Sequence, residues 1–188
     1  MNETFWWVLP DRSNYKGPVT EGKALIPQDF LVPGYVPDPA ELWYSFEHSR
    51  RRDPRRIGDF SGWSSAAFFV NEKGHRIFED LFVRHGRSYQ VRCDGLPHYI
   101  VLIDTLHDAI DLPRSTFERF HLRERVENDI SEMFKIALKT GFETDDDIFR
   151  LDGSYALSTE MIVSNRFKLR YMECGLTGLF FKRTSGGD

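Results

Sequence analysis

Prolines and glycines interrupt the first forty residues of this chain so often that no long helix fits there. Proline fixes the backbone angle φ and lacks an N–H group, and glycine favours turns, so each disfavours regular structure around it. These interruptions fall at Pro10, Gly17, Pro18, Gly22, Pro27, Pro33, Gly34, Pro37 and Pro39. We therefore expect an apolar strand at 5–9, long surface loops after it, and a second short strand at 42–46.

Two later stretches share one pattern, in which an apolar strand runs into a capping residue and then a helix. Residues 66–70 lead to Asn71, and residues 160–163 lead to Ser164. Asn and Ser favour helix N-caps because their side chains accept backbone N–H bonds, and Gly86 and Gly175 fall where each helix should end. The apolar stripe of the first helix is Ile77, Phe78, Leu81 and Phe82.

The remaining pattern predicts a hairpin and short strands. Alternating residues at 89–93 and an apolar run at 98–106 flank a turn at 95–97, and further strands are expected at 148–151 and 179–182. Residues 120–126 fit a strand or a loop. A helix is expected at 130–138, where the apolar residues have helical spacing. Those residues are Ile130, Phe134, Ala137 and Leu138.

These elements predict a single-domain α+β fold with a mixed, mainly antiparallel sheet, packed helices and a loop-rich N-terminal third. Residues 1–63 form that loop-rich region of the same fold, residues 64–183 the core, and residues 184–188 a frayed tail. One common core should bury a set of apolar side chains from both strand-cap-helix units. The set is Phe69, Val70, Phe78, Leu81, Ile100, Leu102, Ile162, Phe167 and Phe180.

Charge and composition narrow the environment and the partners. The 25 Lys and Arg residues against 29 Asp and Glu residues give a net charge of -4, which argues against general nucleic-acid or anionic-membrane binding and slightly favours a basic partner. The two cysteines and the absence of a signal-peptide pattern predict a reducing cytoplasm. No apolar run approaches the roughly 20 residues of a membrane-spanning helix.

Candidate chemical groups are few. The sequence has no Gly-x-Ser-x-Gly elbow, no zinc spacing among its six histidines, and no phosphate-binding glycine loop. Asp104, His107 and Asp108 come closest to an acid/base or metal cluster, since they lie within one turn after a buried strand. Such residues are more often caps and solvated turns, so we expect no catalytic residue, cofactor or metal.

Two segments are candidates for binding a partner. Asp145, Asp146 and Asp147 lack the glycine and the distal glutamate of a calcium loop and form an acidic loop that could face a basic groove. Four aromatic residues flank the arginine-rich run between Arg50 and Arg56, and aromatic and arginine residues together are typical of interface hot spots. These four are Trp43, Tyr44, Phe60 and Trp63, and the alternative is that most of these rings lie in the core.

The second half of the chain resembles a known family. The segments are YIVLIDTLHDAID at 99–111 followed by Ser115, IFRL at 148–151, IVSNRF at 162–167, and CGLTGLFF at 174–181. They resemble the bacterial polymorphic-toxin immunity proteins of immunity family eleven, over residues 64–183. The resemblance implies that the gene lies beside a gene for a toxin used in interbacterial competition. Such a toxin often has a nuclease-type effector domain. The product of the immunity gene would bind that toxin in the producing cell, and the family pattern supplies no catalytic residues.

Three functions therefore remain open. The first is an immunity protein whose partner is a cognate toxin. The second is an enzyme with a dispersed active site near Asp104, His107 and Asp108, and the third is a nucleic-acid-binding module that uses the loop between Arg50 and Arg56. A toxin reading frame immediately upstream favours the first function, whereas an isolated metabolic operon favours the second.

Overall fold

The largest sheet carries the chain's central hairpin. The computed structural model describes residues 4–20, 43–46, 56–64, 67–119, 130–153 and 160–185. Across the six-stranded sheet the strands are β2 (Pro18–Thr20), β3 (Trp43–Phe46), β6 (Gly86–Cys93), β7 (Leu96–Ile103), β5 (Ala67–Asn71) and β4 (Phe60–Ser64). All its strand pairs are antiparallel except β3 with β6, and the hairpin of β6 and β7 lies at its centre with β5 beside β7.

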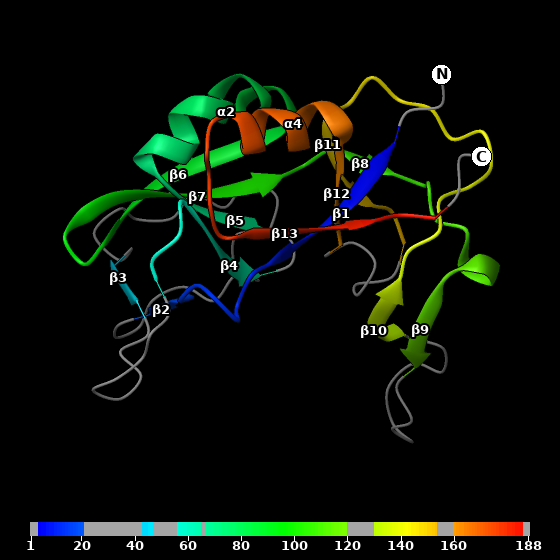
Figure 1. The fold of residues 1–188 in the computed structure, drawn as a ribbon, viewed down its shortest axis with the longest axis horizontal. Helices are drawn as coiled ribbons and strands as arrows, with labels where there is room; N and C mark the ends of the chain where they lie inside the picture. The colour runs from blue at the N-terminus through cyan, green and yellow to red at the C-terminus, as the bar shows by residue number, and fades with distance from the viewer. Residues whose placement is uncertain are drawn as a thin grey trace.

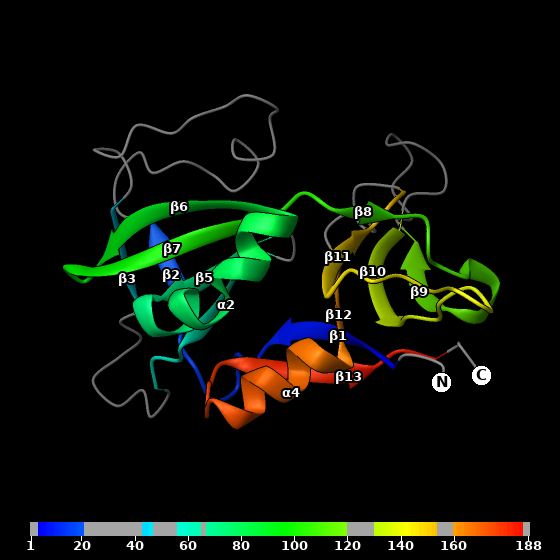
Figure 2. The same cartoon turned by 90° about the horizontal axis from the view of Figure 1, so that it is seen from above.

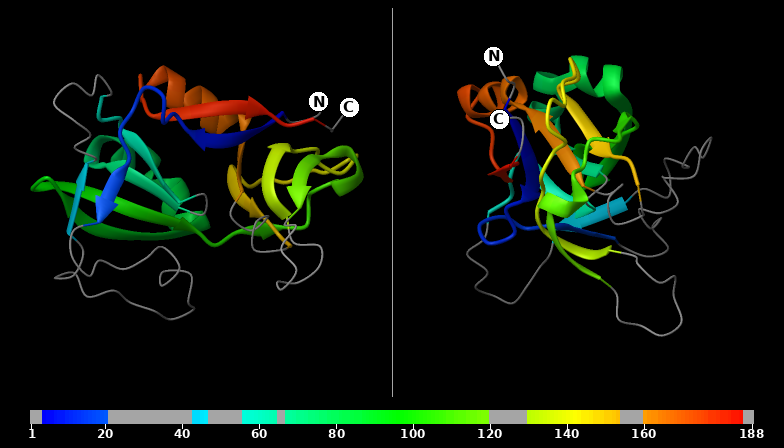
Figure 3. Two further views of the ribbon diagram at one scale, coloured as in Figure 1. Left: turned by 90° about the horizontal axis from the view of Figure 1, so that it is seen from below. Right: turned by 90° about the vertical axis from the view of Figure 1, so that its right-hand side faces the viewer.

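The second sheet joins the two ends of the chain. Its order is β13 (Leu179–Arg183), β1 (Phe5–Pro10), β12 (Met161–Ser164), β11 (Ile148–Leu151) and β8 (Leu106–His107), with only β8 and β11 parallel. The predicted strands at 5–9 and 179–182 are therefore neighbours, as Figure 3 shows. Smaller elements are the 3₁₀ turn η2 (Leu112–Arg114) and the pair β9 (Thr116–Arg119) and β10 (Ile130–Lys135).

The helices α2 (Glu72–His85) and α4 (Asn165–Glu173) begin at the predicted caps. The Asn71 side chain accepts the Gly74 N–H at 2.8 Å, and Ser164 Oγ accepts the Phe167 N–H at 3.1 Å. After α4, Gly175 adopts a left-handed φ of 59°, which suits glycine best and closes the helix end. No helix among the described residues is both long and apolar enough to cross a membrane.

Both helices lie on the same side of the molecule (Figure 1), with α2 over the six-stranded sheet and α4 over the five-stranded sheet (Figure 2). Phe78 of α2 stacks on Phe167 of α4, with ring centroids 4.3 Å apart. Phe60, fully buried, meets Phe78 and Tyr171 edge to face. This main cluster therefore joins the two helix-covered sheets into one α+β domain, which confirms the predicted fold class.

The predicted common core is divided into three clusters. Phe78, with Val70, Leu81 and Phe167, belongs to the main cluster, whereas Ile162 belongs to a cluster on the opposite face of the five-stranded sheet. The rest of the predicted set lies on the far face of the six-stranded sheet, and its members are Phe69, Ile100 and Leu102. The prediction for Phe180 was wrong. This side chain is 56% exposed.

Two local predictions also need correction. Residues 130–135 form the strand β10 and not a helix, because pairing with β9 satisfies their backbone and buries Met133 while Phe134 faces outward. The hairpin turns at Asp94 and Gly95, whose φ angles of 48° and 79° match a type I′ turn, so Leu96 and Pro97 already belong to β7. Residues 120–126 lie outside the described residues.

The fold includes residues beyond the last predicted strand, 179–182. Thr184 is buried, and its N–H donates to the Phe5 carbonyl at 3.2 Å. Ser185 pairs with Ala137, donating to the Ile136 carbonyl at 2.9 Å and accepting from the Leu138 N–H at 2.8 Å. Residues 184 and 185 therefore belong to the fold and not to a frayed tail, and the rest of that predicted tail, residues 186–188, lies outside the described residues.

Truncating a ring of the main cluster should be costly. We expect Phe167→Ala to lower the free energy of unfolding by about 3–5 kcal/mol, because it removes apolar contacts and leaves a cavity against Phe78. Phe180→Ala is the matched control and should cost under about 1 kcal/mol, since that ring is already largely in water. Urea unfolding at pH 7 measures both, and equal losses would contradict this core assignment.

Candidate functional site

The structure separates the three residues proposed as a dispersed active site. Asp104 accepts two bonds from Arg87, at 2.8 and 2.9 Å, and Asp108 pairs with Lys139 at 2.7 Å. His107 turns instead to Asp146, with 2.8 Å between its Nε2 and Oδ2 of the carboxylate. Each member therefore has its own partner, and the three side chains do not combine into one site.

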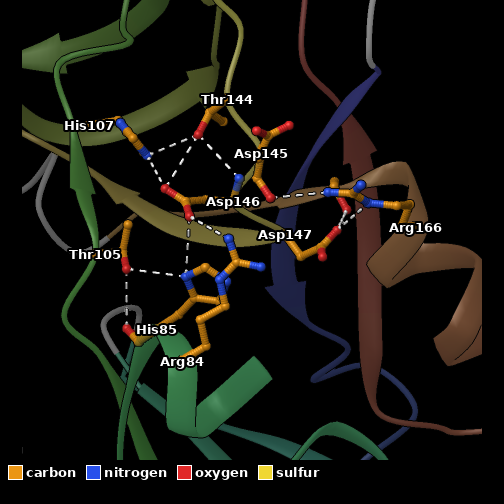
Figure 4. Close-up of polar contacts among 10 residues, drawn as sticks. Arg84, His85, Thr105, His107, Thr144, Asp145, Asp146, Asp147 and Arg166 are labelled. Atoms are coloured by element: carbon orange, nitrogen blue, oxygen red, sulfur yellow. Dashed lines mark hydrogen bonds and ion pairs between the residues drawn. The ribbon is translucent and has the colours of Figure 1, made fainter. Parts of the chain in front are cut away.

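The polar groups that do converge surround residues 144–147, which we call the acidic strap (Figure 4). The strap precedes β11, and β11 pairs with β8, so the strap is brought beside His107. The Arg150 N–H also donates to the Thr105 carbonyl at 2.9 Å and fixes this register. The end of α2 contributes Arg84 and His85 from the other side.

Asp146 is the centre of this network. Its Oδ2 faces His107 Nε2 and also accepts a bond from Thr144 Oγ1 at 3.3 Å. Its Oδ1 lies 3.6 Å from His85 Nδ1 and 3.9 Å from Arg84 Nη2. Burial raises the pKa of Asp146, but the hydrogen bonds and nearby positive charge outweigh it and hold the pKa below its usual value.

His85 is the most buried member, with a side chain 2% exposed. Its Nδ1 lies 3.3 Å from Thr105 Oγ1, while its Nε2 is buried without a hydrogen-bond partner among the described residues. Burial lowers the pKa of His85, and the Asp146 charge offsets only part of this effect. A second ring proton, on Nε2, would point at no acceptor among the described residues, which favours the neutral imidazole.

Asp147 ties the acidic strap to the start of α4. Its Oδ1 accepts from Ser164 Oγ and from Arg166 Nε, the latter at 2.8 Å, and the Ser164 N–H donates to the Asp147 carbonyl at 2.9 Å. A carboxylate beside a helix N-terminus is also favoured by the helix dipole. Of the predicted acidic docking loop, only Asp145 has an exposed side chain. Asp146 and Asp147 hold the fold together instead.

The described side chains of the predicted aromatic cluster lie in the core. Tyr44 is 2% exposed and Phe60 is 0% exposed, so neither ring offers a partner a surface. The side chains of Trp43 and Trp63, and residues 50–55 of the arginine run, lie outside the described part of the structure. Arg56 is exposed, and its backbone pairs with the segment 14–16.

The network geometry does not match a nucleophile relay. A Ser-His-Asp type of triad needs the acid on one ring nitrogen and the hydroxyl on the other. Here Thr144 Oγ1 and Asp146 both approach His107 Nε2, at 3.4 and 2.8 Å. Among the described residues no group of three His, Cys, Asp or Glu side chains is placed to hold a metal ion.

The two cysteines differ in burial: small core or half-buried packing is what the sequence predicts for both, which is confirmed for Cys93 and wrong for Cys174. Cys93 is buried, with Arg92 exposed on the opposite face of β6, whereas Cys174 is exposed after α4. The Arg170 guanidinium donates to Asp80 of α2 at 3.0 Å. This arginine therefore links the two helices.

Glu160 is an unusual acid that no sequence motif marks. It is half-buried just before β12, and Trp7 Nε1 donates to its Oε2 at 2.7 Å. Burial raises the pKa of Glu160 to about 7, and the Trp7 hydrogen bond offsets only part of this effect. The sequence contains one indication of this burial. Glu160 lies two residues before Ile162, which is buried, so in an extended strand the two side chains point to the same face. His85 had a similar signal, one helical turn after Leu81 on the apolar stripe.

The Gly-Leu-Thr-Gly motif that carries the family resemblance is structural. Thr177 donates its N–H and hydroxyl to Asp59 at 3.0 and 2.9 Å, and Leu176 is buried in the main cluster. Gly178 has φ of 104°, and a Cβ there would lie 1.7 Å from the Phe60 carbonyl oxygen.

No protein-family model matches the chain, and no curated protein matches it.

Removing the charge of Asp146 should loosen the network. We expect Asp146→Asn to lower the free energy of unfolding by about 1–3 kcal/mol, because charge-assisted bonds to partly buried groups are lost. Asp145→Asn is the matched control from the same segment and should stay within about 0.5 kcal/mol. Urea unfolding at pH 7 compares them. A loss for Asp145→Asn as large as that for Asp146→Asn would contradict the assigned roles.

Glu160→Gln should change how stability depends on pH. The folded pKa of about 7 exceeds the reference value of 4.5, so the folded chain binds more protons, and its stability falls as pH rises through this range. Gln keeps an acceptor for Trp7 without ionising. The variant should match the natural chain near pH 4, below the reference pKa of 4.5, and exceed it by up to about 3 kcal/mol near pH 8. Parallel stability profiles in thermal or urea unfolding would contradict the raised pKa.

Proposed function

We propose that this protein is an immunity protein, which binds a cognate bacterial toxin in the producing cell and neutralises it by occupying its surface. The toxin would be of the nuclease-effector class that accompanies the resembled family. The resemblance over residues 64–183 supports this proposal, and so does the structural use of its most specific motif around Thr177 and Gly178. A motif that builds the fold is expected in a family whose members share a scaffold and differ in their contacts.

The observation that carries the non-catalytic part of the proposal is the dispersal of the best acid/base candidates. Asp104, His107 and Asp108 each bond to a different side chain. A catalytic set would have to converge on one reacting position about 3 Å from each participating group. Neutralisation is therefore proposed to be stoichiometric.

One observation favours an enzyme as the second candidate. The His107 ring is 27% exposed and is oriented by Asp146, an arrangement that also supports general bases. No hydrogen bond among the described residues reaches its Nδ1. If that nitrogen acted as a base, a His107 variant with an intact fold would lose protection.

The test uses the toxin encoded beside this gene, identified by co-purification from the native host and mass spectrometry. Toxin activity is titrated with purified protein, and we expect inhibition to saturate at about one molecule per toxin with a stable complex. Substoichiometric, time-dependent inactivation would show an enzyme. Failure to bind any adjacent toxin would remove the proposal.

Two variants separate structural from chemical roles in that assay. Asp104→Ala should retain full protection, because it removes only an exposed pair with Arg87. His107→Gln should bind and neutralise the toxin like the natural chain once its fraction folded is matched, although it should be less stable. Loss of protection with normal stability and normal toxin binding would instead identify His107 as a catalytic group.

A further inference from the structure

Strand β13 forms one edge of the five-stranded sheet, and its backbone alternates between two sides. The Asp11 N–H donates to the Gly178 carbonyl at 2.9 Å, and the Thr184 N–H donates to the Phe5 carbonyl at 3.2 Å. In an antiparallel pair the residues bonded to the neighbour alternate along the strand. Residues 180 and 182 therefore face β1, while 179, 181 and 183 direct their N–H and C=O groups outward.

We call this outward side of strand β13 the β13 edge. At both of its ends, the outward backbone groups already form hydrogen bonds within the fold. Leu179 N–H donates to Tyr171 Oη at 2.9 Å, as an outward-facing group can. Ser185 bonds with the segment 136–138, so the chain's own backbone pairs with the next outward residue. Between them, no hydrogen bond within the described residues reaches the outward backbone groups of Phe181.

Side chains around the β13 edge are basic and aromatic. Arg183 is exposed and has no ion pair among the described residues, and Trp6 is its register partner on β1. Lys168 Nζ lies 3.1 Å over the Trp6 ring, which adds a second positive charge on the same face. On the other face, Phe180 is 56% exposed beside Lys182. The strand Leu179–Arg183 contains no acidic residue.

We propose that the β13 edge is a docking site for an extended acidic segment of a partner protein, which adds as a further strand next to Phe181. Main-chain bonds supply the pairing in such strand addition, and alternating side chains supply specificity. Here an acidic side chain can meet Arg183 on one face while an apolar one covers Phe180 on the other. This proposal depends on the proposed function in one respect, because it takes the partner protein to be the toxin.

Charge decides between an acidic partner and a second copy of this chain. Two copies paired edge to edge would bring together two sets of Lys182 and Arg183, and lysine on an edge strand is a common means of preventing self-pairing. An acidic segment instead gains from the charge of Arg183, which is exposed and has no ion pair among the described residues, whereas Lys182 already donates to the Phe134 carbonyl. The acidic side chains of the strap are unsuitable as that segment, because Asp146 and Asp147 are already bonded within the fold.

The first experiment follows backbone amides of the full chain by NMR hydrogen exchange. The probe is a short acetylated peptide in which glutamate alternates with valine, and its counterpart has lysine in place of glutamate. Saturating acidic peptide should slow exchange of the Phe181 amide at least about tenfold, while the Phe180 and Lys182 amides, already bonded to β1, change little. An unchanged Phe181 amide, or equal protection by the lysine peptide, would overturn the proposal.

Charge reversal provides a matched pair of variants. Arg183→Glu should weaken binding of the acidic peptide by roughly tenfold and reduce its salt dependence. Arg76→Glu makes the same change of net charge at an exposed position on α2 and should leave the affinity within about twofold. Equal losses in the two variants would show a general charge effect and not a site.

A backbone substitution directly tests the proposed main-chain hydrogen bonds between Phe181 and the peptide. Cys174 is exposed and allows residues 174–188 to be joined to residues 1–173 by native chemical ligation. Replacing the Phe181 amide by an ester removes an outward N–H, and it keeps the Phe180 carbonyl, which faces β1, as a weaker acceptor. Affinity for the acidic peptide should fall roughly threefold to tenfold against the all-amide chain made by the same ligation. No loss would overturn strand addition.

The same amide measurement separates this inference from the proposed function. If the toxin is bound and neutralised while the Phe181 amide stays unprotected, the docking site is wrong and the immunity role stands. If no adjacent toxin binds but the acidic peptide protects Phe181, the immunity role fails and the docking site stands. Protection of Phe181 that grows with protein concentration alone would show self-pairing and overturn the acidic partner.

Discussion

The stacking of Phe78 on Phe167 is the contact on which the rest of this structure depends. The six-stranded and five-stranded sheets are separate hydrogen-bonded units, so their union relies on the apolar cluster between the helices that cover them. Phe60 reaches this cluster from β4 and Tyr171 from α4. Each buried ring contributes about 1.5–3 kcal/mol by leaving water, and together such rings fix one arrangement of the two sheets.

That arrangement determines where polar groups meet. The end of α2 and the start of α4 are brought to opposite sides of the acidic strap, so Asp146 faces His85 and His107 while Asp147 faces Ser164 and Arg166. The strap therefore contacts the end of α2 and β8 through Asp146, and it bonds to the N-cap residue of α4, Ser164, through Asp147. A run of three acidic residues that looks free in the sequence is mostly bound within the fold.

Local signals predicted much of the fold. The caps at Asn71 and Ser164 follow from side-chain chemistry, and the hairpin follows from alternation, because these depend on neighbours in sequence. The strand β10 and the exposure of Phe180 depend on which segments pair across the chain, and periodicity alone does not contain that information. The Asp146 network was missed for the same reason, since its histidines lie 61 and 39 residues before it in sequence (146 − 85 and 146 − 107).

These assignments change how a partner can be recognised. The described aromatic rings that composition offered as hot spots, Tyr44 and Phe60, support the core, and two of the three acidic side chains support the strap. Groups already bonded within the fold gain little by binding, because a new contact must first break an old one. The outward backbone groups of Phe181 carry no such cost, because no hydrogen bond within the described residues reaches them. Recognition through the main chain of an edge strand takes its specificity from nearby side chains such as Arg183 and Phe180. The residues of the core can then stay the same while the side chains that contact the partner vary.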